Sequence, residues 1–141
     1  MNSYQWEDLK LGMEESFTVT VTEDMLNSFY DITGDSNPMH RDAEYAKKRG
    51  YQDRLVYGML TASFYSTLAG VYLPGEHCIL QECQTSFHLP VYIGDTITVT
   101  GKITELHDVF RRVTVKAVIR NQAGKKVSKA TLIAGVIEDG T

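Results

Sequence analysis

The chain changes its hydrophobic period along its length, and the order of these changes outlines a fold. Residues 16–22 alternate apolar and polar side chains, which is typical of a half-buried strand. Residues 22–33 instead repeat apolar side chains at helical spacing. Thr22 is suited to cap the start of this helix, and Gly34 to end it in a left-handed conformation. The apolar positions of the predicted helix are Met25, Leu26, Phe29 and Ile32.

The middle of the chain predicts two short helical turns followed by one long helix. Asn37 and Pro38 together form a start signal, because Asn caps and Pro fits the first helical position. Asp42 can cap a short helix that runs to Arg49 and ends at Gly50. A long helix is expected over residues 58–72. No charged residue occurs from Leu55 to Gly75, so we expect this helix to be buried on every side.

The remainder alternates as β structure. Strands are expected over 79–89, 95–106, 111–120 and 127–138, with a hairpin turn at 121–126. The chain shows no strand–helix–strand alternation, which argues against a parallel sheet. The pattern therefore predicts an α+β fold, in which a long antiparallel sheet wraps around one central helix and short helices lie outside it. We expect residues 1–141 to form one domain.

Composition narrows the class of protein. The chain has 141 residues and a net charge of −4, which argues against nucleic acid as a partner. The uncharged run carries seven Ser, Thr or Tyr side chains, so we expect no membrane association. Cys78 and Cys83 form no metal-binding motif, and their spacing of five predicts opposite strand faces. We expect free thiols, no bound metal and, since the first twenty residues lack a secretory signal, a cytoplasmic location.

The segment GDSNPMHRD, residues 34–42, concentrates the candidate chemistry. Asp35 and His40 are five positions apart and would diverge on a continuous helix. Pro38 disfavours a continuous helix, so a turn can direct both side chains to one point. A carboxylate and an imidazole that meet at one water form an acid–base pair. Spacing alone leaves the alternative open that these residues are helix caps and a surface histidine.

Gly58 lies at the predicted start of the buried helix. Backbone N–H groups at a helix start lack internal partners and, with the helix dipole, favour a developing negative oxygen. Gly58 is therefore a candidate oxyanion site for a carbonyl substrate. The alternative is an ordinary glycine near a helix start.

These segments, taken in order, resemble the MaoC-like (R)-specific enoyl-CoA hydratase family. The resemblance rests on GDSNPMHRD, YGMLTASFYSTLAG, LPG and FHLPVYIGD, and it covers nearly the whole chain. The family signature Asp-x-Asn-Pro-x-His-x-Asp is present from Asp35 to Asp42. The resemblance implies the hot-dog fold, a curved antiparallel sheet around a central helix. It also implies a homodimer or higher homo-oligomer.

The resemblance further implies a reaction. Asp35 and His40 would activate the water that adds across the double bond of a trans-2-enoyl-CoA, and the expected substrate has a short to medium acyl chain. Which of the two is base and which is acid stays open. Asn37 would orient the loop, and the Gly58 N–H would polarise the thioester oxygen. No cofactor is implied beyond the coenzyme A that the substrate carries.

Two further residues are implied by the resemblance. Ser66 matches the family's active-site serine, with Ser63 as a weaker candidate. Tyr57 is a departure, because many relatives have VHG where this chain has VYG. We expect Tyr57 to tune the pocket or the loop, since the Asp–His pair is intact.

Two other functions share the expected fold. A hot-dog acyl-CoA thioesterase would hydrolyse the same thioester, but such enzymes more often carry an acid on the central helix, and residues 58–73 contain none. A non-catalytic acyl-CoA binding module is disfavoured by the Asp–His pair. Basic residues at 47–49 are read as solvated helix charge. Those at 111–112 and 125–126 are read as strand-edge and turn charges that discourage sheet pairing.

Overall fold

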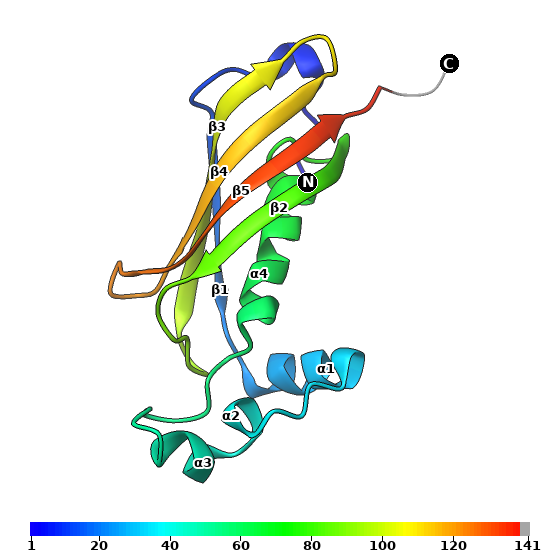
Figure 1. Ribbon diagram of the computed structural model, residues 1–141. Coiled ribbons are helices and arrows are strands. Elements are labelled where there is room, and N and C mark those ends of the chain that lie inside the picture. Colours follow the sequence, from blue (N-terminus) through cyan, green and yellow to red (C-terminus); the bar gives the residue numbers. More distant parts are fainter. Residues whose placement is uncertain (139–141) are drawn as a thin grey trace.

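The computed structural model describes residues 1–138 and shows one five-stranded antiparallel sheet curved around a central helix (Figure 1). The strand order is β1-β3-β4-β5-β2, so β1 and β2 form the edges. The predicted hot-dog architecture is thereby confirmed. The prediction of one domain extends over residues 139–141, which lie outside the described residues. The strands are β1 (Glu14–Thr20), β2 (Cys78–Phe87), β3 (Thr96–His107), β4 (Arg112–Arg120) and β5 (Lys126–Val136).

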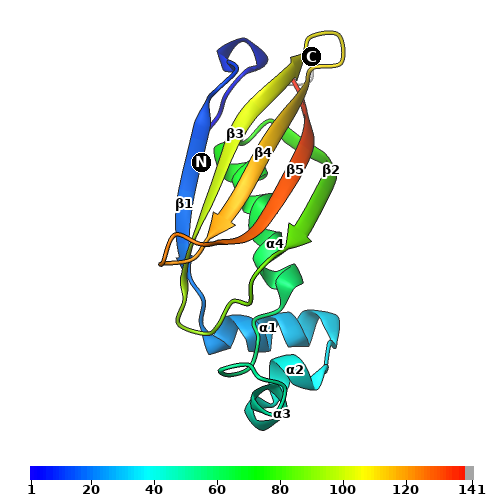
Figure 2. The ribbon, with the colours of Figure 1, turned by 60° about the vertical axis from the view of Figure 1, so that its left-hand side comes forward.

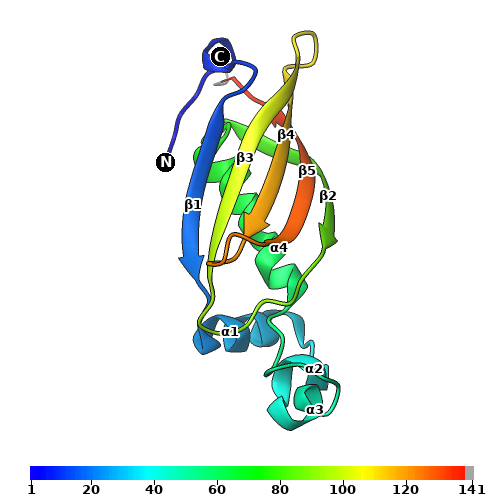
Figure 3. The ribbon, with the colours of Figure 1, turned by 90° about the vertical axis from the view of Figure 1, so that its left-hand side faces the viewer.

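The helices divide into a central one and a group at one end of the sheet. Figures 2 and 3 show α4 behind the strands, with α1, α2 and α3 below the sheet. Among residues 1–138, no helix is long and apolar enough to cross a membrane. The helices are η1 (Trp6–Asp8), α1 (Glu23–Thr33), α2 (Pro38–Arg41), α3 (Ala43–Lys47), α4 (Gly58–Thr67) and the π-helical η2 (Leu68–Tyr72).

The core lies between α4–η2 and the inner face of the sheet. Strand β4 buries alternate side chains, as its sequence predicts, and these contact Leu68 and Leu132 within one apolar cluster. Gly101 on β3 permits the close approach of the helix, because a Cβ there would lie 2.7 Å from a methyl carbon of Leu68. The buried residues of β4 on this face are Val113, Val115, Ala117 and Ile119.

The long predicted helix differs from the observed one in two respects. Its last turn, η2, is π-helical, and the chain leaves it through a cis peptide bond at Pro74. The prediction that it is buried on every side was wrong for the single chain. Met59, Ser63 and Ser66 are exposed, because the sheet covers only the other faces of α4. We call these three residues the open stripe of α4.

Strand β2 carries a β-bulge between Leu80 and Glu82. Cys78 and Cys83 pair with Val136 and Leu132, which are both buried, so both thiols face the helix. The predicted placement on opposite faces was therefore wrong, because the bulge adds one residue and reverses the alternation. Both cysteines are free. Burial raises the pKa of Cys78 to about 11 and raises the pKa of Cys83 above its ordinary value.

Smaller differences concern the ends of elements. Strand β1 begins and ends two residues before the predicted range, and α3 stops at Lys47 before a turn that leads to Gly50. Ile32, predicted on the apolar face of α1, is 81% exposed. Leu26 on the same helix is fully buried, so the amphipathic prediction holds at the start of α1 and fails at its end.

Candidate functional site

The site begins where α1 ends. Gly34 adopts the left-handed conformation with φ of 69°, and its N–H donates to the carbonyl of Tyr30, as predicted for a helix stop. Asp35 then leaves the helix, and its N–H donates to the hydroxyl oxygen of Thr33 at 3.2 Å. Its Oδ1 accepts from the N–H of Asn37 at 3.1 Å. Among residues 1–138, the second carboxylate oxygen accepts no hydrogen bond.

Asn37 and Pro38 start α2 in the predicted manner. The side chain of Asn37 accepts from the N–H of Met39 at 2.9 Å, and Pro38 occupies the first turn. Asp42 then caps α3 by accepting from the N–H of Tyr45 at 3.2 Å. The chain therefore reverses between Asp35 and His40, which a continuous helix would not do. The side chain of Asn37 lies within this turn, and its role in orienting the loop for catalysis stays a prediction.

His40 is held in one tautomer. Its Nδ1 lies 2.8 Å from the carbonyl oxygen of Leu55, which can only accept, so Nδ1 carries the hydrogen. The N–H of Leu55 in turn donates to the carbonyl of Met39 at 3.0 Å. In the neutral ring, Nε2 therefore presents a lone pair and can accept a proton. This is the arrangement that a general base needs.

Tyr57 connects the two candidate catalytic residues. Its hydroxyl donates to the backbone carbonyl of Asp35 at 2.7 Å. Its ring stacks on the His40 ring with centroids 4.2 Å apart, and the Phe29 ring lies against it at 4.8 Å. The side chain is 1% exposed. Burial raises the pKa of the phenol, with the charge of Arg41 opposing the shift, so Tyr57 stays protonated and donates.

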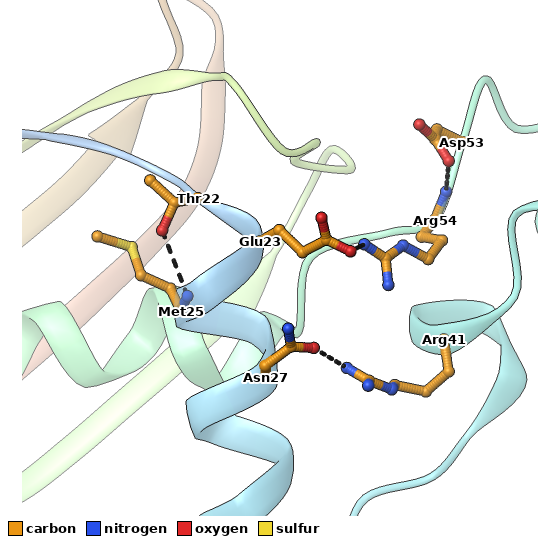
Figure 4. A network of polar contacts seen from close by, with 7 residues as sticks. All are labelled: Thr22, Glu23, Met25, Asn27, Arg41, Asp53 and Arg54. Atoms are coloured by element: carbon orange, nitrogen blue, oxygen red, sulfur yellow. Dashed lines mark hydrogen bonds and ion pairs between the residues drawn. The ribbon is translucent and has the colours of Figure 1, made fainter.

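A polar network fastens α2 and the segment before α4 to α1 (Figure 4). Arg41 donates to the side-chain oxygen of Asn27 at 3.1 Å, and its guanidinium lies 4.6 Å from the ring centre of Tyr30. Arg54 forms an ion pair with Glu23 at 2.9 Å. These contacts hold the two segments that flank His40 against the same helix. They fix where the imidazole lies relative to the start of α4.

Gly58 and His40 line one cavity of about 270 Å³ at the start of α4. Within the described chain, the N–H of Gly58 donates no hydrogen bond, as expected for the first residue of a helix. A Cβ on Gly58 would lie 3.2 Å from two ring carbons of Phe87, so the missing side chain lets that ring form a wall. The other lining residues are Tyr51, Leu55, Val56, Thr61, His88, Leu89, Pro90, Val91 and Val127.

The structure places the six predicted site residues in two groups. Asp35, Asn37 and Tyr57 do not line the 270 Å³ cavity, but they adjoin it through the contacts of Tyr57 with His40. Ser66 is exposed and lines a separate cavity of about 320 Å³, which it shares with Ser63. Within one chain, Ser66 is therefore not brought together with His40.

Several residues that shape the site carried no sequence signal. Phe87 is one, since its strand pattern gave no reason to place it against Gly58. The carbonyl of Leu55, which fixes the His40 tautomer, is another, because any residue supplies a carbonyl. Thr61 donates to the carbonyl of Gly58 at 2.6 Å and lines the cavity. Only the proximity of Thr61 to Gly58 on the predicted helix could have suggested it.

Comparisons with known proteins identify relatives of this chain. The (R)-specific enoyl-CoA hydratase of Rhodospirillum rubrum is 36% identical over 103 residues, which are 73% of this chain and 72% of that protein. A mitochondrial 3-hydroxyacyl-[acyl-carrier-protein] dehydratase of Solanum lycopersicum is 40% identical over 89 residues, which are 63% of this chain and 53% of that protein. The solved (R)-hydratase from A. caviae involved in PHA biosynthesis superposes with a TM-score of 0.89 at 27% identity, and covers 93% of this chain and 99% of that one. Residues 8–124 match the MaoC-like domain, and the chain belongs to that family.

Proposed function

We propose that this protein is an (R)-specific enoyl-CoA hydratase, a hydro-lyase that adds water reversibly to a trans-2-enoyl-CoA. The observation that carries the proposal is the His40 ring, which has a fixed tautomer and lines the same cavity as the unpaired N–H of Gly58. A base and an oxyanion donor in one cavity suit the addition of water next to a thioester. The R. rubrum relative bears the same activity in its name.

In the proposed reaction, neutral His40 accepts a proton from water through Nε2. The carboxylate of Asp35 accepts a hydrogen bond from the same water and orients it. The water oxygen bonds to C3 of the substrate, and the double-bond electrons move toward the thioester oxygen. That oxygen accepts a hydrogen bond from the backbone N–H of Gly58. The imidazolium then returns the proton to C2, so atoms and charge balance.

The test is hydration of crotonyl-CoA by the purified protein, followed by the loss of enoyl-thioester absorbance and by chiral analysis of the product. We expect (R)-3-hydroxybutyryl-CoA, with kcat lowered at least about 10²-fold in Asp35→Asn and His40→Gln. Folded wild-type protein without hydration would refute the proposal. A thiol reagent in the same assay detects a thioesterase, which would release free CoA without double-bond addition.

We also propose a homodimer in the cytoplasm, with no cofactor beyond the CoA of the substrate. Support for the dimer comes from the open stripe of α4 and from edge strand β2, where Leu80 and Phe87 are partly exposed. A second copy would cover both and would bring its own side chains toward Ser66. The two free thiols suit a reducing compartment. Light scattering during size-exclusion chromatography measures the oligomeric state.

A further inference from the structure

The charges of the chain are strongly segregated. Residues 111–136 contain seven Lys or Arg, half of the 14 in the chain, and none of its 18 acids. This segment is β4, the hairpin turn and β5. A protein with a net charge of −4 therefore carries one strongly basic region among otherwise acidic surroundings.

The cations of these two strands gather on the outer face of the sheet. In β4 the exposed side chains alternate with buried ones, so they point away from α4, which Figures 2 and 3 show behind the strands. Three of the lysines line a groove of about 510 Å³ together with hydroxyl and amide side chains. We call the five exposed cations of β4 and β5 the basic face; they are Arg112, Lys116, Arg120, Lys126 and Lys129.

Sheet stability does not explain the basic face. Arg120 lies directly opposite Lys126 across β4 and β5, and Lys116 lies directly opposite Lys102 across β3 and β4. Like charges in such pairs destabilise a sheet. In the part of the chain that the structure describes, the ion pairs involve none of the five cations. The acid nearest in register is Glu105, which lies opposite Thr114 of β4; Glu14 and Glu82 lie farther out, on the edge strands.

Protection of a sheet edge does not explain it either. The interpretation of residues 111–112 as strand-edge charges requires that β4 lie at the border of the sheet. Lys125 does lie in the predicted turn, but that turn accounts for none of the charges within the strands. Strands β4 and β5 each have a neighbour on both sides, so they present no open edge. The charges therefore point to an anionic partner.

The basic face ends beside the cavity that holds His40. Lys126 lines the groove, and the next residue, Val127, lines the cavity. In the same way Ser86 lines the groove and Phe87 the cavity. Successive strand residues point to opposite faces, so the groove and the cavity lie on the two faces of the same end of the sheet, and a partner on the basic face would reach the cavity around that end.

We propose that the basic face docks an acidic acyl carrier protein, which delivers its enoyl group to this cavity on a phosphopantetheine arm. The proposal rests on the proposed hydratase function. Coenzyme A and a carrier protein present the same pantetheine thioester and differ only at the far end. Charge complementarity would speed their encounter and set their orientation.

The size and composition of the surface favour a protein over the other anions. Arg112 and Arg120 lie eight residues apart on β4, about 27 Å, so the exposed cations are spread more widely than the phosphates of one nucleotide. Strands β4 and β5 contain no aromatic residue on which bases could stack, which disfavours single-stranded nucleic acid. An acidic protein surface matches both features.

The experiment compares crotonyl-CoA with crotonyl-acyl carrier protein as substrates of wild type, Lys129→Glu and the double variant Lys116→Glu/Lys129→Glu. We expect kcat/KM for the carrier-protein substrate to fall about 10-fold or more in the double variant at low salt, and kcat/KM for crotonyl-CoA to change less than about 2-fold. Lys10→Glu is the matched control, since this exposed lysine lies outside the basic face. Added salt should lower the wild-type rate with the carrier protein toward that of the double variant.

Two outcomes would overturn the proposal. A loss confined to crotonyl-CoA would mean that the face binds the nucleotide phosphates of coenzyme A, and an equal loss with both substrates would mean that the substitutions act on the site and not on docking. Equal rates for Lys129→Glu and Lys10→Glu with the carrier protein would mean that the face docks nothing of this kind. Anisotropy of labelled holo-acyl carrier protein measures docking without turnover. Docking weakened by Lys129→Glu supports the inference even where the hydratase assay fails, and docking unchanged refutes it.

Discussion

Removal of the Tyr57 hydroxyl should separate the stability of the protein from its activity. Tyr57→Phe deletes one hydrogen bond of 2.7 Å to the Asp35 carbonyl and leaves the stacked ring in place. Loss of one such bond costs about 1 kcal/mol, which lowers Tm by roughly 3–5 °C in a chain of this size. The effect on activity should be larger, because the same bond holds the start of the turn that carries Asp35.

A displacement of about 1 Å in a catalytic group costs on the order of 10²-fold in rate. We therefore expect Tyr57→Phe to lower kcat for crotonyl-CoA about 10- to 100-fold, with KM changed less than about 3-fold. Tyr4→Phe is the control, because its hydroxyl donates to Glu15 at 2.8 Å and contacts none of the site residues. Equal Tm losses with full kcat in both variants would refute a positioning role for Tyr57.

Other predictions follow from the packing and from the pKa shifts. Gly58→Ala should lower kcat/KM while stability changes by less than about 1 kcal/mol, because helix propensity offsets the 3.2 Å contact with Phe87; unchanged kinetics would show that the ring yields freely. Cys78, with a pKa of about 11, should react with iodoacetamide at pH 8 about 100-fold more slowly than glutathione, as measured by mass spectrometry. Burial raises the pKa of Tyr57, so its contribution to stability is present below the unfolded pKa of about 10 and is lost as pH rises through the folded value. The melting temperature should therefore fall less steeply with pH above pH 10 in Tyr57→Phe than in wild type. Parallel plots of melting temperature against pH for the two proteins would contradict this.

The layout of the fold was accessible from sequence because local and global signals agree. The alternation in β4 and the caps at Thr22, Asn37 and Asp42 each correspond to an observed contact or burial pattern. The bulge in β2 was not accessible, because it depends on how that strand pairs with β5 and not on its own residues. Burial of α4 was overestimated, since an uncharged helix face has the same pattern whether its own sheet or another molecule covers it.

The site was accessible only in part for a similar reason. Spacing indicated that Asp35 and His40 could converge, but the residue that joins them was visible only as a departure from the family pattern. Tyr57 contacts the backbone carbonyl of Asp35 and the ring of His40, and neither contact corresponds to a sequence motif. The charges at 111–112 were wrongly interpreted as edge charges, because the order of strands in the sheet decides which strands have an edge to protect.

The open stripe of α4 has a practical consequence for enzymology. If a second copy covers Met59, Ser63 and Ser66, as proposed, part of the folding free energy comes from association and follows mass action. Dilution would then dissociate the dimer and lower the free energy of unfolding. Specific activity would decline at nanomolar enzyme, and the melting temperature would rise with protein concentration. Kinetic constants for this protein therefore need to be compared at one stated protomer concentration.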